Sequence, residues 1–468
     1  MLGGAGMRAI QLDSNLLEFY AQRHRDTAII ARNFHRNGYR LLWPEADLNG
    51  RGPNFVECEF PLYPFAVALL YGVFGEDERI GRLVNIALCL LTACLLFLVS
   101  RRLDSEAAGL WAAGFYLASP LAIFFGRTFQ PDPTMVCLGV AGLYALEVAL
   151  GDRRSGLVLV SAACLSLASL VKPTALPMLL PGVYLWWRAL GWKFLRQGSA
   201  WLWLLIIVVP LPLWFAHARQ LGELSGNRYF EATAGWLGGW SAWTWPQVQN
   251  MAFRWMYLVA TPIGALFALA GLVKNAGQPN RLAAIWFAAG FIGVALLPGP
   301  NLRHHYYQLP LIPPVALLIG IAAASATNAV RGGIFAALLA LSLLAPASFI
   351  TPFYQTDDAT VACGRAVAGV VRSYDTVLAV DPHTSGILYY AGCAGYHSPA
   401  TKLTRARLQD YMKQGVTLVA ISRVTATALF RGNYWDHLPT DTATELAKHW
   451  TQVEATDRYR IYRRRPLP

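Results

Sequence analysis

Charged residues are scarce in this sequence. Asp, Glu, Lys and Arg make up 14% of the 468 residues, and 55% are hydrophobic, whereas a soluble protein is nearer a quarter charged. This composition excludes an ordinary water-soluble domain and indicates an integral membrane protein. Sixteen Trp and twenty Tyr suit the interfacial belts of such proteins, where amphipathic rings settle.

The sequence also lacks a basic tract and a CxxC pair, and these two absences limit the partners and metal sites to be expected. No tract is rich in Lys and Arg, so nucleic acid is not an expected partner, and the net charge of +12 favours anionic lipid or phosphate. No CxxC pair occurs among the seven cysteines, so a cysteine metal cluster is not expected. Cys363 and Cys393 lie in a less hydrophobic tail. The two cysteines either form a disulfide, which would add about 3–4 kcal/mol of stability, or remain two free buried thiols.

Runs of about 16 to 22 residues with almost no charge are long enough to cross a bilayer. We identify ten of them, at roughly 83–100, 107–126, 133–150, 156–171, 173–190, 201–216, 252–273, 282–298, 308–324 and 332–350. Every second connection carries arginine or lysine, for example Arg101 with Arg102 and Arg153 with Arg154. By the positive-inside rule those loops are cytoplasmic. The segment up to about 82, the 127–132 turn, Lys172, 217–251, 299–307 and everything after about 351 then face outward.

The N-terminal region lacks a signal peptide and a spanning helix. Residues 1–10 are too short to cross the bilayer and have no cleavage site, although a segment on the outer face normally follows a membrane helix. We therefore expect a first span to be missing upstream of Met1. Residues 61–75 are apolar, short and interrupted by proline, and they favour a helix lying in the outer interface.

From Thr356 the composition changes to that of a small α/β domain. Short buried strands are expected at 375–380 and 416–422, amphipathic helices at 359–373 and 404–415, and a last edge strand at 459–465. The predicted organisation is a transmembrane domain over 1–350, which includes a first outer loop of about 11–82, and an extracytoplasmic α/β domain over 356–468.

Ionisable residues near apolar spans are costly, so their positions are informative. The candidates all map to the predicted outer side: Asp26, Glu57, Glu59, Arg127, Asp132, Lys172, Arg303, His304 and His305. The cytoplasmic loops are too short for a nucleotide-binding domain. Any chemistry is therefore expected outside the cytosol.

Each candidate also has a structural interpretation. Asp26 precedes a helical run that stops at Gly38 and would serve as its N-cap, and Asp132 stands at the start of a span, before Pro133. Lys172 either extends to the headgroups or binds a phosphate beside a helix N-terminus that begins with proline. The planar guanidinium groups of Arg127 and Arg303 suit the same phosphate.

Three further residues complete the candidate set. Glu59 comes just before the interfacial helix, where it would organise the loop or contact the acceptor. His304 and His305 would act as metal ligands with Asp26 or Glu59, or as ordinary interfacial residues. No cofactor is required by these patterns, and a divalent metal stays open.

Five stretches together resemble a known family, the polytopic GT-C glycosyltransferases. The likeness extends in order over residues 20 to about 325, and it is nearest to the bacterial relatives of protein O-mannosyltransferases and of the lipid A aminoarabinose transferase. The stretches are HRDTAIIARNF, EFPLYPFAVALLYGVFG, RRLDSEAAGLWAAGFYLASPLAIFFGRTFQPD, SLVKPTALP and RHHYYQLPLIPPVALLIG.

The resemblance implies a function. Such enzymes move a sugar from a polyprenyl phosphate carrier to a lipid, glycan or protein acceptor outside the cytosol. It implies catalytic acids at Asp26 and Asp132, and donor phosphate contacts from Arg127, Lys172 and Arg303. The sequence departs from the family pattern at Arg25, where a second acid or a neutral residue is expected. The implied location is the bacterial cytoplasmic (inner) membrane, with the site facing the periplasm or exterior.

Chemistry and topology agree with this resemblance. Sugar transfer needs a base for the acceptor hydroxyl and cations for the departing phosphate, and the absence of a cytosolic domain favours a lipid-linked donor. A multi-span transporter of a lipid-linked or small anionic substrate is the main alternative. It would place ionisable groups and broken helices near the middle of the bilayer. A membrane anchor for the α/β tail is a third interpretation, which leaves the acids and bases of the outer loops unexplained.

Overall fold

The computed structural model describes residues 1–226, 243–325, 329–383, 385–423 and 437–466. The chain forms two compact units. The helical unit comprises Met1–Leu12, Arg82–His217 and Phe230–Ile350, and the mixed unit comprises Asp13–Gly81, Ala218–Tyr229 and Thr351–Pro468. The mixed unit thus combines the first predicted outer segment with the C-terminal domain. Residues 227–242 of the predicted outer loop 217–251 lie outside the described residues.

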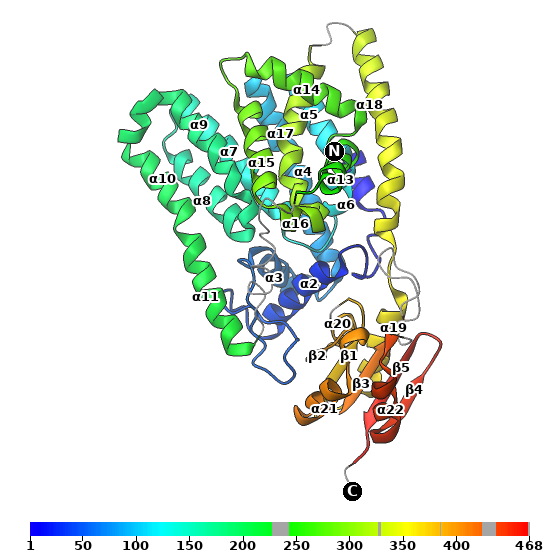
Figure 1. The fold of residues 1–468 in the computed structure, drawn as a ribbon. Helices are drawn as coiled ribbons and strands as arrows, with labels where there is room; N and C mark the ends of the chain where they lie inside the picture. Colours follow the sequence, from blue (N-terminus) through cyan, green and yellow to red (C-terminus); the bar gives the residue numbers. More distant parts are fainter. Residues whose placement is uncertain (227–242, 326–328, 384, 424–436, 467–468) are drawn as a thin grey trace. The chain divides into compact units, whose positions relative to one another are not determined.

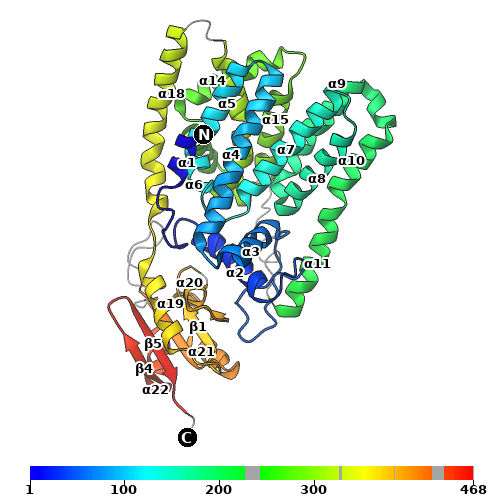
Figure 2. The same ribbon diagram turned by 180° about the vertical axis from the view of Figure 1, so that it is seen from behind.

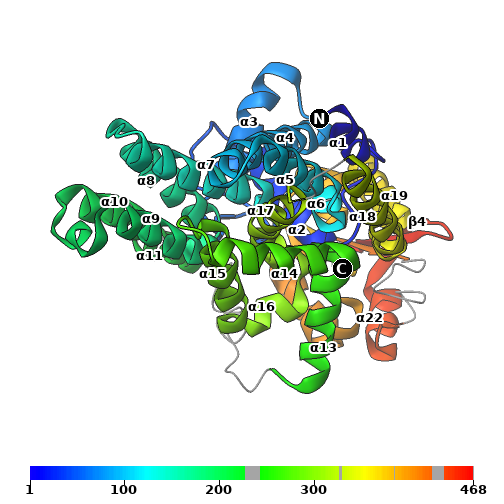
Figure 3. The ribbon, with the colours of Figure 1, turned by 90° about the horizontal axis from the view of Figure 1, so that it is seen from above.

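The helical unit is built from α-helices joined by short 3-10 and π segments (Figures 1 and 3). Two helices, α4 and α11, also supply residues to the mixed unit. The elements are α1 (Leu2–Arg8), α4 (Glu78–Leu103), α5 (Glu106–Ala118), α6 (Pro120–Phe125), α7 (Asp132–Gly151), α8 (Gly156–Val171), η1 (Pro173–Met178), α9 (Leu179–Leu190), η2 (Gly191–Arg196), α10 (Gly198–Val208), α11 (Pro210–Ser225), α13 (Trp245–Arg254), η5 (Trp255–Val259), α14 (Pro262–Ala276), α15 (Leu282–Leu296), α16 (Pro298–Arg303), η6 (His305–Leu311), α17 (Ile312–Ala323) and α18 (Ala329–Ile350).

The most buried helix of this unit is α17, which packs against α5 and α14. Glycine permits this close approach. A Cβ at Gly271 of α14 would lie 1.9 Å from the carbonyl oxygen of Leu318, and one at Gly320 would lie 2.4 Å from that of Ala108. Small residues at helix contacts are typical of membrane proteins, because backbones must approach closely to gain packing energy.

Four helical stretches among the described residues are long and apolar enough to cross a membrane, and a bent pair makes a fifth. The ten predicted runs are helical, but several are divided. The predicted run 252–273 is not one continuous helix, because the chain bends by 92° between η5 and α14. Thr261 stands at the bend with φ 62° and Pro262 follows it, and proline disfavours the helical conformation of the preceding residue. Likewise 107–126 is interrupted at Ser119, before Pro120.

The mixed unit combines helices with one five-stranded sheet (Figure 2). Its elements are α2 (Ala21–Arg36), α3 (Leu62–Phe74), η7 (Thr351–Tyr354), α19 (Asp358–Val370), β1 (Val377–Val380), α20 (Gly386–Ala391), β2 (Gly395–His397), η8 (Ala400–Lys402), α21 (Arg405–Lys413), β3 (Leu418–Ser422), α22 (Thr440–His449), β4 (Trp450–Ala455) and β5 (Tyr459–Arg464). The strand order is β2-β1-β3-β5-β4. Strand β1 is parallel to β2 and β3, whereas β5 is antiparallel to β3 and β4.

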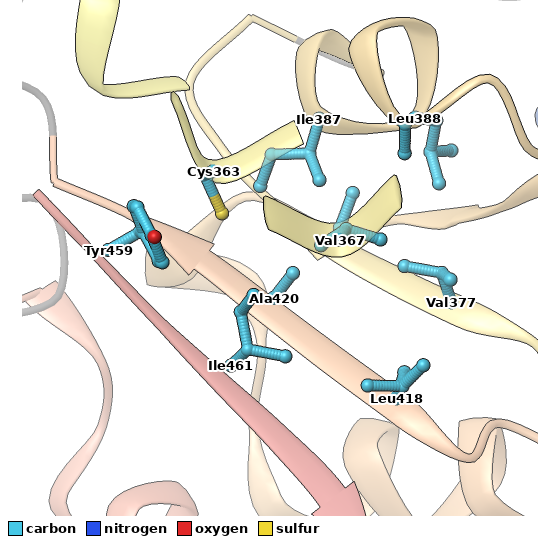
Figure 4. Close-up of a cluster of buried hydrophobic side chains, with 11 residues drawn as sticks. Cys363, Val367, Val377, Ile387, Leu388, Leu418, Ala420, Tyr459 and Ile461 are labelled. Carbon is cyan, nitrogen blue, oxygen red and sulfur yellow. The ribbon is translucent and has the colours of Figure 1, made fainter. Parts of the chain in front are cut away.

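Alternate residues of the central strands face two different apolar cores. Leu378 and Val380 of β1 pack with Leu408 of α21 and Leu446 of α22. Val377 and Ala379 face the other way, and their cluster includes Cys363 and Ile387 (Figure 4). Because successive side chains of a strand point to opposite faces, the sheet carries a helix layer on each face. Cys363 and Cys393 are free thiols, and burial raises the pKa of both.

The predicted strands and helices of the tail are confirmed, with one correction. The strand at 459–465 is not at the edge, because β4 pairs with its far side. Strand β4 is exposed along most of its length and lacks the apolar alternation that would have revealed it.

The first predicted outer segment is joined to the sheet by backbone hydrogen bonds. Gly50 N–H donates to the carbonyl oxygen of Gly395 at 2.9 Å, and Gly395 N–H donates to that of Asp47 at 3.1 Å, beside β2. Arg32 of α2 links the same parts, because it bonds to the Asp47 carboxylate at 2.6 Å and to the carbonyl oxygen of Tyr389 at 2.7 Å. The predicted helix at 61–75 is confirmed as α3, which leaves Leu69, Val73 and Phe74 exposed.

Asp357 caps α19 and connects it to the loop after β1. Its carboxylate accepts hydrogen bonds from Ala359 N at 3.0 Å, Thr360 N at 3.1 Å, Thr360 Oγ1 at 2.6 Å and His383 Nε2 at 3.1 Å. Burial alone would raise the pKa of the Asp357 carboxyl, but the bonds from His383 and Thr360 outweigh it and hold the pKa below its usual range. The ionised form is therefore favoured by folding.

The variant Asp357→Asn should lose stability and lose part of the acid sensitivity. A carboxyl whose native pKa is depressed stabilises the fold above its ordinary pKa of about 4, and that stability disappears as the pH falls through the native value. At neutral pH we expect the free energy of unfolding to fall by about 1–2 kcal/mol, as for the loss of other N-caps. Thermal unfolding of the whole chain between neutral pH and about pH 3 tests this. The control is Asp358→Asn, which changes the exposed neighbouring acid. Equal losses of stability in the two variants would contradict the role of Asp357 as the cap of α19.

Candidate active site

Lys172 and Asp132 form a buried ion pair in the helical unit. Lys172 has an extended backbone between α8 and η1, and Asp132 is the first residue of α7. The Lys172 Nζ donates to Asp132 Oδ1, and the two side chains are 1% and 0% exposed. The interpretation that Lys172 extends to the headgroups is therefore wrong. Its acidic partner lies 40 residues away in sequence, so local sequence could not identify it.

Two tyrosine rings complete the surroundings of the ammonium. Lys172 Nζ lies 4.2 Å from the ring centroid of Tyr306 and 4.5 Å from that of Tyr307, distances at which cations are attracted by aromatic faces. The His304 ring stacks on Tyr306, with centroids 5.1 Å apart. The structure thus brings together three predicted site residues, Asp132, Lys172 and His304.

Asp132 does not cap its helix through its side chain. Helix α7 begins at this residue, as predicted, but its N-cap is Pro131 and no side-chain cap bond is present there. An acid in the first turn is favoured by the helix dipole, and the carboxylate reaches Lys172 instead of the helix N–H groups. The capping interpretation of Asp132 is replaced by the ion pair.

The two predicted phosphate-binding arginines differ in their surroundings. Arg127 is fully buried, and its Nη1 donates to the carbonyl oxygen of Gln11 at 3.2 Å. Arg82 donates to the same carbonyl oxygen at 3.0 Å, so both cations hold the N-terminal segment of the unit. Arg303 is the last residue of α16 and is exposed.

A third arginine was missed by sequence reasoning. Arg254 ends α13, just before the π segment and the 92° bend. It is 9% exposed, and its Nη1 donates to the carbonyl oxygen of Asn301 at 3.0 Å. The same oxygen accepts from Gln308 Nε2 at 3.1 Å. The available signal was a lone cation inside the predicted span 252–273, a feature that marks functional positions in membranes.

A largely apolar cavity lies beside Tyr307 of η6. It is lined by residues of η1, α15 and η6, among them Met178, Trp286, Gly290, Val294 and Tyr307. Glycines on α15 contribute to its shape, since a Cβ at Gly290 would lie 2.6 Å from Leu311. A cavity lined mainly by apolar groups suits a hydrocarbon ligand.

Asp26 belongs to the mixed unit and lies inside a helix. Helix α2 begins at Ala21, after Tyr20 at φ 61°, so Asp26 stands in the second turn and its interpretation as the N-cap is wrong. The helix ends at Arg36, shortly before Gly38 at φ 98°, as predicted. The Asp26 side chain is 14% exposed, and its Oδ1 lies 3.8 Å from Nη2 of Arg25.

Glu59 pairs with another residue of the same helix. Its Oε2 lies 2.9 Å from Nη2 of Arg23, across partly buried side chains, and this contact ties the segment before α3 to α2. His305 is half-buried at the start of η6. Within the described ranges, no group of three or more His, Cys, Asp and Glu side chains is arranged to hold a metal ion.

Comparisons with known proteins relate this arrangement to other chains. A model of the dolichyl-phosphate-mannose-protein mannosyltransferase family matches residues 58–215. No curated protein matches the sequence. ArnT from Cupriavidus metallidurans, solved bound to undecaprenyl phosphate, is similar with a TM-score of 0.66 at 16% identity, over 98% of this chain and 96% of that one.

Two other solved structures share the architecture. The oligosaccharyltransferase of Archaeoglobus fulgidus has a TM-score of 0.60 at 11% identity, and the match covers 90% of this chain and 67% of that one. The arabinofuranosyltransferase AftD from mycobacteria has a TM-score of 0.57 at 14% identity, with coverage of 100% and 39%. The fold is that of the GT-C glycosyltransferases.

The GT-C assignment confirms several predictions. The GT-C fold implied by the resemblance is confirmed, as are a mostly helical architecture with several apolar helices and a small C-terminal sheet. In the GT-C chain the predicted residues fall into two groups. Asp26 and Glu59 belong to the mixed unit, and the helical unit holds Arg127, Asp132, Lys172, Arg303, His304 and His305.

Proposed function

We propose that this GT-C protein transfers a sugar from a polyprenyl phosphate carrier to a lipid, glycan or protein acceptor. The observation that carries the proposal is the match over almost the whole chain to ArnT bound to undecaprenyl phosphate. A second GT-C structure, AglB from Archaeoglobus fulgidus, holds a dolichol-phosphate and an inhibitory peptide. Carrier lipids in two such structures favour a lipid-linked donor here.

The proposed location is the bacterial cytoplasmic membrane, with the active site on the outer side. The support is the arginine-rich character of alternate loops, which the positive-inside rule assigns to the cytoplasm. Asp26, Asp132 and Lys172 map to the other set of connections. Membrane lipids are the remaining partners in this proposal.

Lys172 is the proposed anchor for the donor phosphate. The Asp132 carboxylate and the rings of Tyr306 and Tyr307 hold the ammonium in place, and its positive charge would attract the phosphate oxygens of the donor. Arg127 and Arg303, together with the newly found Arg254, are proposed to add positive charge. The apolar cavity next to Tyr307 would receive the first isoprene units of the carrier.

Asp26 is the proposed general base. The acceptor hydroxyl attacks the anomeric carbon, the bond from that carbon to the phosphate oxygen breaks, and polyprenyl phosphate leaves with the electron pair. The Asp26 carboxylate takes the hydroxyl proton, and the fixed cations stabilise the charge that grows on the phosphate. Asp132 acts through Lys172 in this scheme, whereas Glu59 organises the segment before α3.

A reconstituted assay tests the function directly. The purified chain in sealed proteoliposomes is given undecaprenyl phosphate carrying a labelled sugar, together with envelope lipids and glycans of the native cell as acceptors. We expect label in an acceptor and an equal amount of free undecaprenyl phosphate, both measured by mass spectrometry. Label that enters the vesicle lumen without a glycosyl product would contradict the proposal and favour the transporter.

A further inference from the structure

Arg25, the neighbour of the proposed base, is held in an unusual way. Its side chain is 0% exposed, and its Nε donates to the Ser385 hydroxyl at 3.1 Å. Nη1 and Nη2 make no hydrogen bond with any described residue, and Nη2 lies 3.8 Å from the Asp26 carboxylate. A buried guanidinium with few hydrogen bonds destabilises the fold. Its presence beside Asp26 therefore calls for a role there.

Ser385 sits in a loop that is fixed at both ends. The loop follows β1, and the Asp381 carboxylate accepts hydrogen bonds from His383 N at 2.8 Å and Ile387 N at 3.2 Å. His383 also bonds to Asp357 at the start of α19. Ser385 itself is fully buried and has φ 72°, a conformation that a non-glycine residue seldom adopts. The position of its hydroxyl is thus set by the sheet and by α19.

His397 of β2 faces the same group of residues. Its Nε2 donates to the carbonyl oxygen of Asp381 at 2.8 Å. Burial lowers the pKa of His397, and the charge of Arg25 lowers it further, while Asp381 and Asp26 oppose this. A neutral ring that donates to a carbonyl holds the loop without competing for the Asp26 carboxylate. Arg25 is a cation in contact with that carboxylate.

We propose that Ser385 and Arg25 are positioning residues for Asp26, so that the C-terminal α/β domain sets the orientation of the general base. The hydroxyl of Ser385 fixes Arg25 through Nε, and the Nη2 end of Arg25 directs the Asp26 carboxylate by charge. The 3.8 Å separation is longer than a hydrogen bond, and such contacts tighten when substrate binds. The inference rests on the proposed function, and it gives the C-terminal domain a part in the reaction.

The variant Ser385→Gly provides a sharp test. Glycine adopts a positive φ without strain, so this change removes the hydroxyl without straining the backbone. It also leaves the buried Nε of Arg25 without its acceptor, so thermal unfolding must show that the variant is folded. We expect kcat to fall by about 10- to 100-fold, the effect of losing a hydrogen bond to a charged group and misplacing the base. The KM for the lipid-linked donor should stay within about twofold, because Lys172 still holds the phosphate. If Ser385 has only a structural role, the folded variant should show no loss of kcat.

A double-mutant cycle with Arg25→Lys tests whether Ser385 acts through Arg25 or whether the two residues affect kcat independently. Lysine keeps the charge but has no Nε–H fork for Ser385. If Ser385 acts through Arg25, adding Ser385→Gly to Arg25→Lys lowers kcat no further. Losses that multiply would overturn the proposal. Ser398→Ala serves as control, because it removes another buried hydroxyl of the same domain and should leave kcat unchanged.

The outcomes separate this inference from the proposed function. If the wild-type chain transfers no sugar, the proposed function itself fails. If Asp26→Asn is inactive while Ser385→Gly keeps full kcat, only the positioning proposal fails. If Ser385→Gly does not fold, Arg25→Lys decides the matter, and wild-type kcat in that folded variant overturns the proposal.

Discussion

Asp26→Asn is expected to lower kcat for sugar transfer by about 10²- to 10⁴-fold, the usual contribution of a general base. The amide has nearly the same shape but cannot take the acceptor proton. Asp26 lies in the second turn of α2 and makes no N-cap bond to that helix, so the substitution should leave expression, membrane insertion and thermal stability close to those of the wild type. The measurement is the initial rate of product formation with saturating donor.

Two matched variants make the result specific to Asp26. Asp13→Asn changes an acid of the same unit whose side chain is 80% exposed, and it should retain full activity. Asp26→Glu keeps the carboxylate but moves it, and an intermediate rate is expected. Full activity of Asp26→Asn would remove the proposed base.

Lys172→Met is expected to have the second large effect, on both stability and donor binding. Removing one partner of a buried ion pair leaves the other charge uncompensated, at a cost of about 3–5 kcal/mol. The Asp132 carboxylate would be that charge, because its side chain is fully buried. Loss of the ammonium also removes the proposed contact with the donor phosphate, so the apparent affinity for donor should fall sharply.

A double variant separates these two effects. Lys172→Met with Asp132→Leu removes both charges, and replacing a whole buried pair with apolar side chains is often close to neutral in stability. We expect this double variant to recover the unfolding temperature but not the binding of undecaprenyl phosphate, measured by titration in detergent. Wild-type affinity in the double variant would show that Lys172 does not bind the phosphate.

Sequence reasoning identified groups with unusual environments more readily than their partners. Lys172 stood out as a lone cation between apolar runs, but Asp132 becomes its partner only when α7 and the end of α8 come together. Arg254 was hidden inside a run that looked like a single span. The bend at Thr261 was signalled by Pro262, whereas its angle depends on the packing of α14 against α17.

The C-terminal domain was predicted well in its buried parts and poorly at its margin. Strands β1 and β3 are buried on both faces and read as continuous apolar runs. Strand β2 has three residues and β4 is largely exposed, so neither leaves a clear pattern. The contact of Ser385 with Arg25 joins segments 360 residues apart, and no local pattern indicates such a contact.

The composition of the mixed unit has a consequence for biosynthesis. Residues 13–81 and 351–468 belong to one compact unit, yet the helical unit apart from Met1–Leu12 is translated between them. Helix α2 is therefore synthesised long before β1 and α20. Apolar residues in and just before this helix, such as Leu17, Ala21 and Ile30, stay unpacked until Val361 and Tyr389 have been synthesised and can contact them. Exposed apolar surface of this kind attracts chaperones and proteases, so assembly of the mixed unit is a late step, completed only after the last helix of the helical unit has been translated.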